Sequence, residues 1–399
     1  MNSIERVKAA LHFTQPDKVP IFKVGLPTDI FPTVMLPSKK WHPGHTTQER
    51  GLFPHPADDI LYKIRVRRWK KPKWAKKEKK YRGLKWLNYP REEIDEWGCI
   101  WNRSGDNATM GHPGRSTLNN WDDLDNYLNN YTPDPFDKSH YSLMIKLSKL
   151  LGRKRYRLFT AGYVGPSQTA SMMRGFSRYL IDHRKNSDKL QKLLEYLTDW
   201  YIDTMDGWIK FGGKPHGFLL VDDLGEQTGP FFGPKLFEKF YEPVYGKLIK
   251  AAHDRGCELH MHCCGKIDKL LPLFIKWGMD AFEFDSPRMT GYTDLKPFRG
   301  KIMFWGCINI QSIYTKGTPE ECEREVWHMM RNLGTKNGGF GAYFYPQTHH
   351  IQAPRENQKA FLRGLKKYGT YSNIPKSWWE YQATEDWGNY NVPKLPSTE

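Results

Sequence analysis

The chain has 399 residues and a formal net charge of +17, and its 15 Trp and 21 Tyr make it rich in aromatic side chains. This composition excludes a disordered chain, and the length allows a substantial buried core. No apolar run approaches the roughly 20 residues that span a bilayer, and the N-terminus lacks the apolar core of a secretory signal. We therefore expect a soluble, cytoplasmic protein.

Much of the positive charge lies in one segment. Residues 61–85 contain thirteen Lys and Arg and one acid, Glu78, interleaved with aromatic residues. Such a segment could bind a nucleic-acid backbone, dock an acidic protein partner, or form a solvated insertion. Because no zinc-knuckle, RNA-recognition or helix-turn-helix pattern is present, nucleic acid is the least favoured partner.

The first predicted element is an amphipathic helix over residues 3–12, capped by Ser3, with Arg6 and Lys8 facing outward. A first strand is predicted over residues 18–26.

Residues 27–137 are rich in Pro, Gly, Trp and charge, with one short strand-like run at 97–101. We interpret them as an N-terminal elaboration, including the basic segment 61–85, of a single domain over 1–399.

From residue 138 onward, apolar strand-like runs alternate with helical patterns, as in a parallel α/β fold. The predicted strands are 156–163, 217–222, 257–264, 279–285, 301–306 and 340–345. The predicted helices are 167–182, 188–211, 234–255, 267–277, 319–333 and 355–368. Thr318, Pro319 and Glu321 form a capping box that fixes the start of the fifth helix.

Polar residues follow most of these strands. They are Tyr163, Asp222, Asp223, His262, Cys264, Glu283, Asp285, Cys307, Asn309, His349 and His350. In a (β/α)8 barrel the carboxyl ends of all strands meet at one mouth, where such enzymes place their chemistry. A Gly-rich nucleotide-binding loop after an early strand would favour an open doubly wound sheet, but the sequence contains no such loop. The sequence therefore predicts a TIM-type (β/α)8 barrel with an elaborated N-terminal region.

The strand at 257–264 carries a candidate metal site. Period-two geometry places Glu258, His260, His262 and Cys264 on one face, so that face consists almost wholly of donor atoms. Imidazole and thiolate together suit zinc, and large cytosolic chains use cysteines more often for metal than for disulfides. The alternative is a buried core histidine beside an inert free thiol.

The order of several short motifs resembles the uroporphyrinogen decarboxylase superfamily, and within it the zinc-dependent methyltransferases that work with corrinoid proteins. The motifs are Glu5-Arg6-Val7, Asp95-Glu96-Trp97-Gly98, Trp121-Asp122-Asp123-Leu124, Arg174-Gly175, Asp222-Asp223-Leu224-Gly225, His262-Cys263-Cys264-Gly265, Trp305-Gly306-Cys307-Ile308-Asn309, Gly317-Thr318-Pro319-Glu320-Glu321 and residues 346–357. The resemblance also implies a TIM-type barrel.

The resemblance implies zinc bound by a His-x-Cys pair, here His262 and Cys264, and by a later Cys. His349 stands at about the place of that missing Cys and is the predicted third ligand, or else an acid-base residue. Candidates for a fourth or substitute ligand are Glu283, Glu226 and Cys307.

Other residues near the predicted mouth are candidates for catalysis or binding. Asp222, Asp223 and Asn309 could orient a ligand or transfer a proton, or could simply cap helices. The candidate substrate-binding aromatic residues are Tyr163, Trp305, Phe231 and Phe232, for which core packing is the commoner role.

A zinc site with more nitrogen and oxygen donors is a harder Lewis acid, which suits a substrate oxygen better than a thiol. We therefore expect methyl transfer from an aromatic methyl ether to the reduced cobalt of a corrinoid on a partner protein, which the basic segment predicts to be acidic. The alternative is transfer from a methylated corrinoid to coenzyme M or tetrahydrofolate. Decarboxylation is less favoured, because the decarboxylase binds its anionic substrate through an N-terminal arginine pair, and residues 21–26 contain no arginine.

Overall fold

A computed structural model describes residues 1–36, 91–94, 97–103, 112–114, 116–162, 164–346, 348, 351–375 and 378–379. By the contacts within the chain these residues form two compact units. One contains residues 1–33, 147–159 and the described part of 215–399. The other contains the described parts of 34–146 and 160–214.

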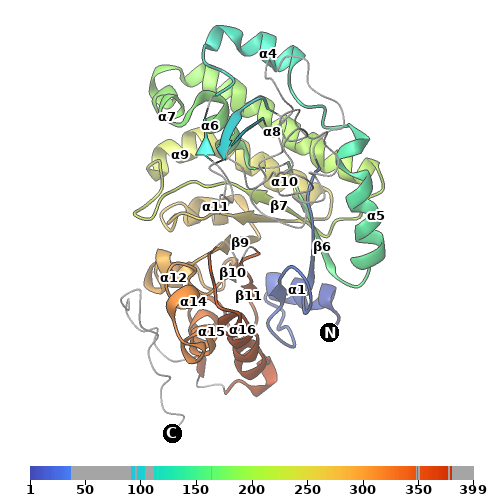
Figure 1. Ribbon diagram of the computed structural model, residues 1–399, viewed down its shortest axis with the longest axis vertical. Helices are drawn as coiled ribbons and strands as arrows, with labels where there is room; N and C mark the ends of the chain where they lie inside the picture. Colours follow the sequence, from blue (N-terminus) through green and yellow to red (C-terminus); the bar gives the residue numbers. More distant parts are fainter. Residues whose placement is uncertain are drawn as a thin grey trace, which may run out of the picture. The chain divides into compact units, whose positions relative to one another are not determined.

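The first unit is built on an eight-stranded sheet in the order β1-β11-β10-β9-β8-β7-β6-β2. Figure 1 labels β6, β7, β9, β10 and β11 of this sheet. The strands are β1 (Ile21–Phe22), β2 (Ile30–Thr33), β6 (Tyr156–Thr160), β7 (Gly217–Val221), β8 (Glu258–His262), β9 (Ala281–Phe284), β10 (Met303–Gly306) and β11 (Phe340–Tyr343). The strands are parallel, and they form a nearly closed barrel. β1 and β2 are the two ends of this strand order. Between them, the backbone N–H of Asp29, the residue before β2, donates to the Ile21 carbonyl at 2.7 Å. The predicted TIM-type (β/α)8 fold is confirmed.

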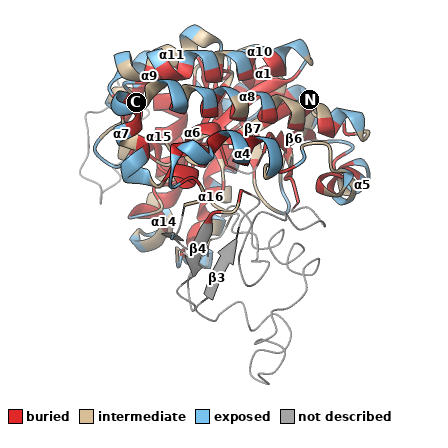
Figure 2. Cartoon of the chain, turned by 90° about the horizontal axis from the view of Figure 1, so that it is seen from above, coloured by how far each residue is buried: buried red, intermediate tan, exposed pale blue. Residues whose placement is uncertain are grey.

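Helices cover the outside of this barrel. They are α1 (Ser3–Leu11), α9 (Pro234–Tyr241), η5 (Glu242–Gly246), α10 (Lys247–Asp254), α11 (Leu271–Trp277), α12 (Pro287–Thr290), α13 (Tyr292–Leu295), η6 (Lys296–Phe298), α14 (Ile313–Lys316), α15 (Pro319–Leu333), α16 (Arg355–Tyr368) and η7 (Tyr371–Asn373). Bands of buried and exposed residues alternate along α10 and α11, as expected of amphipathic helices with one face on the sheet (Figure 2). The predicted capping box is present: Thr318 Oγ1 accepts from the Glu321 backbone, and Glu321 Oε2 accepts from the Thr318 backbone.

The inside of the barrel is filled by alternate residues of each strand. Trp305 of β10 points inward and is fully buried in a cluster with Phe22, Tyr156 and Met303. Its partner in register on β11 is Gly341, where a Cβ atom would lie 2.3 Å from the Trp305 ring. A glycine is therefore required beside this tryptophan, and inward and outward positions on β11 are fixed.

The N-terminal helix differs from its prediction in two respects. Asn2, not Ser3, is the cap, because its Oδ1 accepts from the Glu5 backbone at 3.0 Å. Arg6 is buried, not outward, and its guanidinium pairs with Asp17 and Asp29, each at 2.7 Å. A buried charge is tolerated here because both carboxylates compensate it.

Three other predicted elements differ from the structure in more than the position of their ends. Residues 30–33, assigned to the N-terminal elaboration, form barrel strand β2, which pairs with β6. The helix predicted over 234–255 contains a π-turn, η5, at Pro243, since proline cannot donate the regular helical hydrogen bond. The helix predicted over 167–182 is two helices, because Gly175 adopts a φ of 79° between them.

The second unit contains a small antiparallel sheet and several helices. Its strands are β3 (Arg91–Ile94), β4 (Ile100–Arg103) and β5 (His112–Pro113). Its helices are η3 (Trp121–Asp123), α4 (Leu124–Asn130), η4 (Lys138–His140), α6 (Pro166–Arg174), α7 (Phe176–Lys185) and α8 (Ser187–Lys210), while α5 (Ser142–Leu151) has residues in both units. Arg174 and Trp121 both donate to the buried Asp182.

The basic segment 61–85 lies outside the described residues. Among the helices that the structure describes, none combines the length and the apolar character needed to cross a membrane.

Candidate functional site

Hydrogen bonds join the chain at the end of β7 to the chain at the end of β8. The Asp222 backbone N–H donates to the His262 carbonyl at 3.0 Å, and the Cys264 backbone N–H donates to Asp223 Oδ1 at 2.9 Å. A Cβ atom on Gly265 would lie 2.2 Å from the Gly225 carbonyl oxygen. Glycine thus permits the close approach that brings the Asp223 carboxylate beside Cys264.

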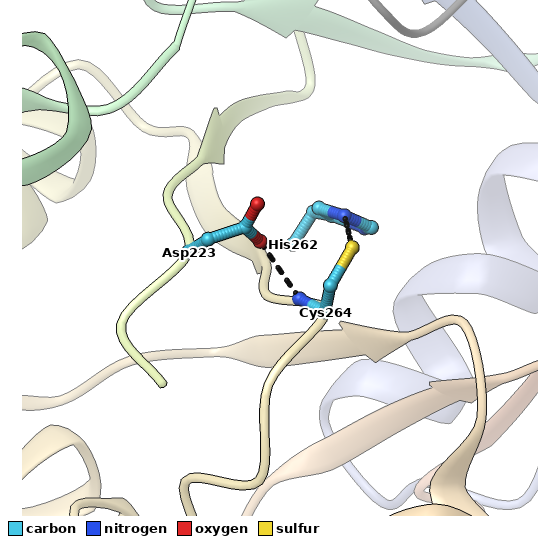
Figure 3. Close-up of side chains that lie close together, drawn as sticks. All are labelled: Asp223, His262 and Cys264. Carbon is cyan, nitrogen blue, oxygen red and sulfur yellow. Dashed lines mark hydrogen bonds between the residues drawn. The ribbon is translucent and has the colours of Figure 1, made fainter. Parts of the chain in front are cut away.

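Five side chains with possible metal-ligand atoms converge at the carboxyl ends of β7, β8 and β9. His262 Nε2 lies 3.1 Å from Cys264 Sγ, and the Cys264 thiol donates to Asp285 Oδ2 at 3.4 Å. His262 Nδ1 is in very short contact with Glu283 Oε2. Figure 3 shows the first of these contacts, with Asp223 beside the Cys264 backbone. We call Asp223, His262, Cys264, Glu283 and Asp285 the mouth cluster.

The protonation of the mouth cluster is set by burial and by crowding of acidic groups. Burial raises the pKa of Glu283 to about 7 and also raises that of Asp285. Burial, with Asp223 and Asp285, raises the pKa of the Cys264 thiol well above its usual value. Burial lowers the pKa of His262, but Cys264 and Glu283 outweigh it and raise that pKa well above the ordinary value. The cluster therefore holds protons that its acidic groups would otherwise lose.

The cluster fits a divalent cation. Ligand atoms of Asp223, His262 and Cys264 lie within 4.8 Å of one another, as do those of His262, Glu283 and Asp285. In a tetrahedral zinc site, Zn–N and Zn–S bonds of about 2.0 and 2.3 Å separate the two ligand atoms by about 3.5 Å. Glu283 Oε1 and Asp285 Oδ1 are buried without a hydrogen-bond partner among the described residues. Such atoms are costly unless a proton or cation compensates them.

Glu283 holds the ring of His262 in place. It was predicted to be a ligand, but its Oε2 faces Nδ1 of His262, while Nε2 faces Cys264. A carboxylate on one ring nitrogen commonly fixes the orientation of a histidine whose other nitrogen binds metal. When Nε2 is the ligand atom, Glu283 has an orienting role, and Asp223 and Asp285 are the carboxylates that could hold an ion beside His262 and Cys264.

Two tyrosines at the end of β11 were not among the predicted site residues. Gly341 faces inward against Trp305, and Phe344 faces outward, where its ring stacks on Phe361 of α16 at 4.0 Å. Alternation along the strand therefore turns Tyr343 and Tyr345 inward, toward the mouth. The Tyr343 ring packs edge-on against Phe22 at 5.2 Å. A pair of tyrosines two residues apart at a strand end was the signal that could have identified them.

Asp222 and Asp223 have opposite orientations, because they are adjacent on an extended backbone. Asp222 is fully buried on the helix side of the barrel, and its Oδ2 accepts from Tyr245 Oη of η5 at 2.7 Å. Asp223 is half-buried and belongs to the mouth cluster. Of the two predicted catalytic aspartates, only Asp223 lies in the cluster.

The predicted aromatic residues are spread over different surroundings. Trp305 is fully buried in the barrel interior, and its Nε1 donates to His260 Nδ1 at 3.1 Å. Phe232 is buried, with its ring tilted against Tyr241 of α9. Phe231 is half-buried in the loop after β7.

The remaining predicted residues lie at the rim or outside the described chain. Asn309 is buried, and its Oδ1 accepts from the Gln311 backbone at 2.9 Å, which is a loop-capping role. Cys307 is buried after β10, and Glu226 is exposed; neither is in the two groups of close ligand atoms found among the described residues. Tyr163 and His349 lie outside the described residues.

The other donor residues of β8 form a separate hydrogen-bonded column in the barrel floor. Tyr156 Oη donates to Glu258 Oε2 at 2.8 Å and lies 3.1 Å from His260 Nε2. Because Trp305 donates to Nδ1 of His260, the neutral ring carries its proton on Nε2 and donates to Tyr156. Burial lowers the pKa of His260 to about 4, which keeps the ring neutral. Only the upper half of the predicted donor face contributes to the mouth cluster.

Comparison with known proteins agrees with this architecture. Residues 115–367, more than half of the chain, match the family model described as uroporphyrinogen decarboxylase (URO-D). A search of curated protein sequences found no match. A solved methyltransferase from Methanosarcina mazei is similar in fold, with 16% identity, a TM-score of 0.53, and coverage of 92% of this chain and 99% of that one. A B12-independent methionine synthase from Shewanella sp. W3-18-1, solved with selenomethionine, has 13% identity and a TM-score of 0.33, covering 69% of this chain and 72% of that one.

Proposed function

The chain belongs to the uroporphyrinogen decarboxylase family, and we propose that it is a zinc-dependent methyltransferase. It moves a methyl group from an aromatic methyl ether to the reduced cobalt of a corrinoid carried by a partner protein. The observation that carries this proposal is the mouth cluster, in which sulfur, imidazole and carboxylate donors converge at the catalytic end of a TIM-type barrel. The similar fold of a protein described as a methyltransferase supports it.

His262 Nε2, Cys264 Sγ and a carboxylate of Asp223 or Asp285 are the groups that would hold zinc. Bound there, zinc would supply Lewis acidity to the oxygen of the substrate. Glu283 orients His262, and the hydrogen bond from the Cys264 backbone N–H to Asp223 Oδ1 fixes Asp223 beside Cys264. The carboxylates make the donor set rich in oxygen, which favours an oxygen substrate over a thiol.

An aromatic ether is favoured over an aliphatic one because of its leaving group. A phenol has a pKa of about 10, so its oxygen is expelled far more easily than an aliphatic alkoxide. Methyl transfer to coenzyme M or tetrahydrofolate is the alternative, for which a site with more sulfur would be better suited. Decarboxylation is disfavoured, because residues 21–26 contain no arginine that could match the N-terminal arginine pair through which the decarboxylase binds its anionic substrate.

The partner remains part of the proposal. The corrinoid protein is expected to be acidic, so that the basic segment 61–85 can attract it electrostatically. Nucleic acid is not proposed as a partner.

A direct test is to mix zinc-loaded protein with reduced cobalamin and a panel of methoxylated aromatic compounds and methylamines. Formation of methylcobalamin, measured by its absorbance, is expected with the methoxylated aromatic compounds and not with the protein after chelation. Methylcobalamin from the methylamines alone would contradict the ether assignment. Decarboxylation of uroporphyrinogen, with no methyl transfer from any donor, would contradict the proposal as a whole.

A further inference from the structure

Two hydroxyl groups face the mouth cluster without a hydrogen-bond partner among the described residues. The Tyr343 and Tyr345 hydroxyls bond to no described residue, and both side chains are half-buried, so a ligand in the mouth can reach them. Tyr345 is the nearer to the rim, and Asp285 and Cys264 act on it electrostatically. Tyr343 lies one layer deeper, where its ring packs against Phe22, and Glu283 acts on it electrostatically.

The proposed reaction is faster when hydrogen-bond donors lie beside the ether oxygen of the substrate. When a methyl ether loses its methyl group, negative charge develops on the ether oxygen. The carboxylates of Asp223, Glu283 and Asp285 cannot provide a hydrogen bond to that oxygen when they are ionised, because an ionised carboxylate only accepts hydrogen bonds. Hydrogen-bond donors aimed at the developing charge lower the barrier, and removing one such donor typically slows an enzyme by about 10²–10³-fold.

We infer that Tyr343 and Tyr345 form the donor wall of the substrate site, with Tyr345 donating a hydrogen bond to the leaving oxygen and Tyr343 positioning the ring that carries it. This inference rests on the proposed function and requires a methyl donor whose leaving atom is an oxygen with a free lone pair. Quaternary methylammonium compounds have no such lone pair on nitrogen and are excluded.

In the transfer step the bond between the methyl carbon and the ether oxygen breaks, and its electron pair stays on the oxygen. The reduced cobalt of the corrinoid partner provides the electron pair of the new carbon–cobalt bond. Tyr345 keeps its proton throughout and only donates a hydrogen bond, and the phenolate product takes a proton from solvent after release.

The test uses the full zinc-loaded chain, reduced cobalamin and a series of methyl aryl ethers whose ring substituents change the basicity of the leaving phenolate. We expect Tyr345→Phe to slow the transfer about 100-fold for the most basic leaving group and progressively less for weaker bases. A merely structural role would slow all ethers equally. Tyr343→Phe is expected to raise KM with a smaller change in kcat.

A second measurement does not depend on turnover. Binding of 4-nitrophenolate, a mimic of the product, is followed by titration and by its absorbance shift. Tyr345→Phe should weaken binding about tenfold, because a hydrogen bond to a charged acceptor is lost. The matched control is Tyr371→Phe, which also removes a hydroxyl with no hydrogen-bond partner among the described residues, here in η7, and should change neither quantity.

The outcomes separate the two proposals. Unchanged rates and unchanged nitrophenolate binding in Tyr345→Phe, with an active wild-type protein, overturn this inference alone. A wild-type protein that demethylates none of the ethers contradicts the proposed function. Nitrophenolate binding then decides whether the hydroxyls of Tyr343 and Tyr345 form an oxygen-binding wall. Equal wild-type rates with a quaternary methylammonium donor overturn the substrate class.

Discussion

The two halves of strand β8 have the same kinds of donor side chains but opposite surroundings. In the floor of the barrel, Glu258 and His260 are satisfied by Tyr156 and Trp305. At the mouth, His262 lies in a cluster whose buried Glu283 and Asp285 each have an oxygen without a partner in the described chain. A histidine in a strand is therefore a structural residue when protein groups complete its hydrogen bonds, and a candidate ligand when its surroundings are left incomplete.

The largest expected difference between the two halves of β8 is in zinc content, which should fall when a residue of the mouth half is replaced. Cys264→Ala removes the sulfur beside His262 Nε2, so we expect zinc content to fall from about one per chain to near zero, and methyl transfer with it. The matched control is Cys263→Ala. Cys263 faces away from the mouth and its Sγ accepts from the Leu224 backbone, so this variant should retain zinc. Metal analysis showing zinc retained in Cys264→Ala and lost in Cys263→Ala would reverse the assignment.

A second expected difference is in the pH dependence of stability. Burial raises the pKa of Glu283 from 4.5 to about 7, so the metal-free fold is stabilised by the protonated carboxyl below pH 4.5 and loses this as pH rises through 7. His262, whose pKa is also raised, changes in the same direction. Zinc should therefore stabilise the protein more at pH 8 than at pH 5.5. At pH 8, free zinc at a thousandfold excess over its Kd should stabilise the protein by about 4 kcal/mol in total.

Thermal unfolding with and without zinc at both pH values measures this effect. Glu283→Gln cannot titrate, so the pH dependence of the metal-free variant should be shallower than that of the wild-type protein. Equal zinc stabilisation at the two pH values would mean that the mouth cluster does not bind the ion.

The smallest expected effect concerns the barrel floor. Tyr156→Phe removes the hydroxyl that bonds both Glu258 and His260, leaving buried polar atoms with fewer partners. We expect the free energy of unfolding in urea to fall by about 1–3 kcal/mol, with zinc content unchanged. Loss of zinc in this variant would show that the floor and the mouth are not independent.

The barrel and the core of its site could be predicted because they depend on local patterns. Alternation along 257–264 places His262 and Cys264 on one face, and polar residues after successive strands converge in any parallel barrel. The capping box at Thr318 is likewise contained in four consecutive residues.

The other features depend on contacts between distant segments. Whether Asp222 or Asp223 faces the mouth depends on the register of β7, and the orienting role of Glu283 depends on which nitrogen of His262 it meets. Arg6 was expected at the surface because its partners, Asp17 and Asp29, lie on other segments. No pattern within one segment carries this information.

The contact between Gly225 and Gly265 has a consequence for how the site could diversify. Two backbones that touch cannot be spread to admit a bulkier molecule without separating the aspartate of one loop from the cysteine of the other. In relatives with larger or smaller substrates, the residues that follow β10 and β11 on the opposite wall should therefore differ. The two glycines should be the same in all of them.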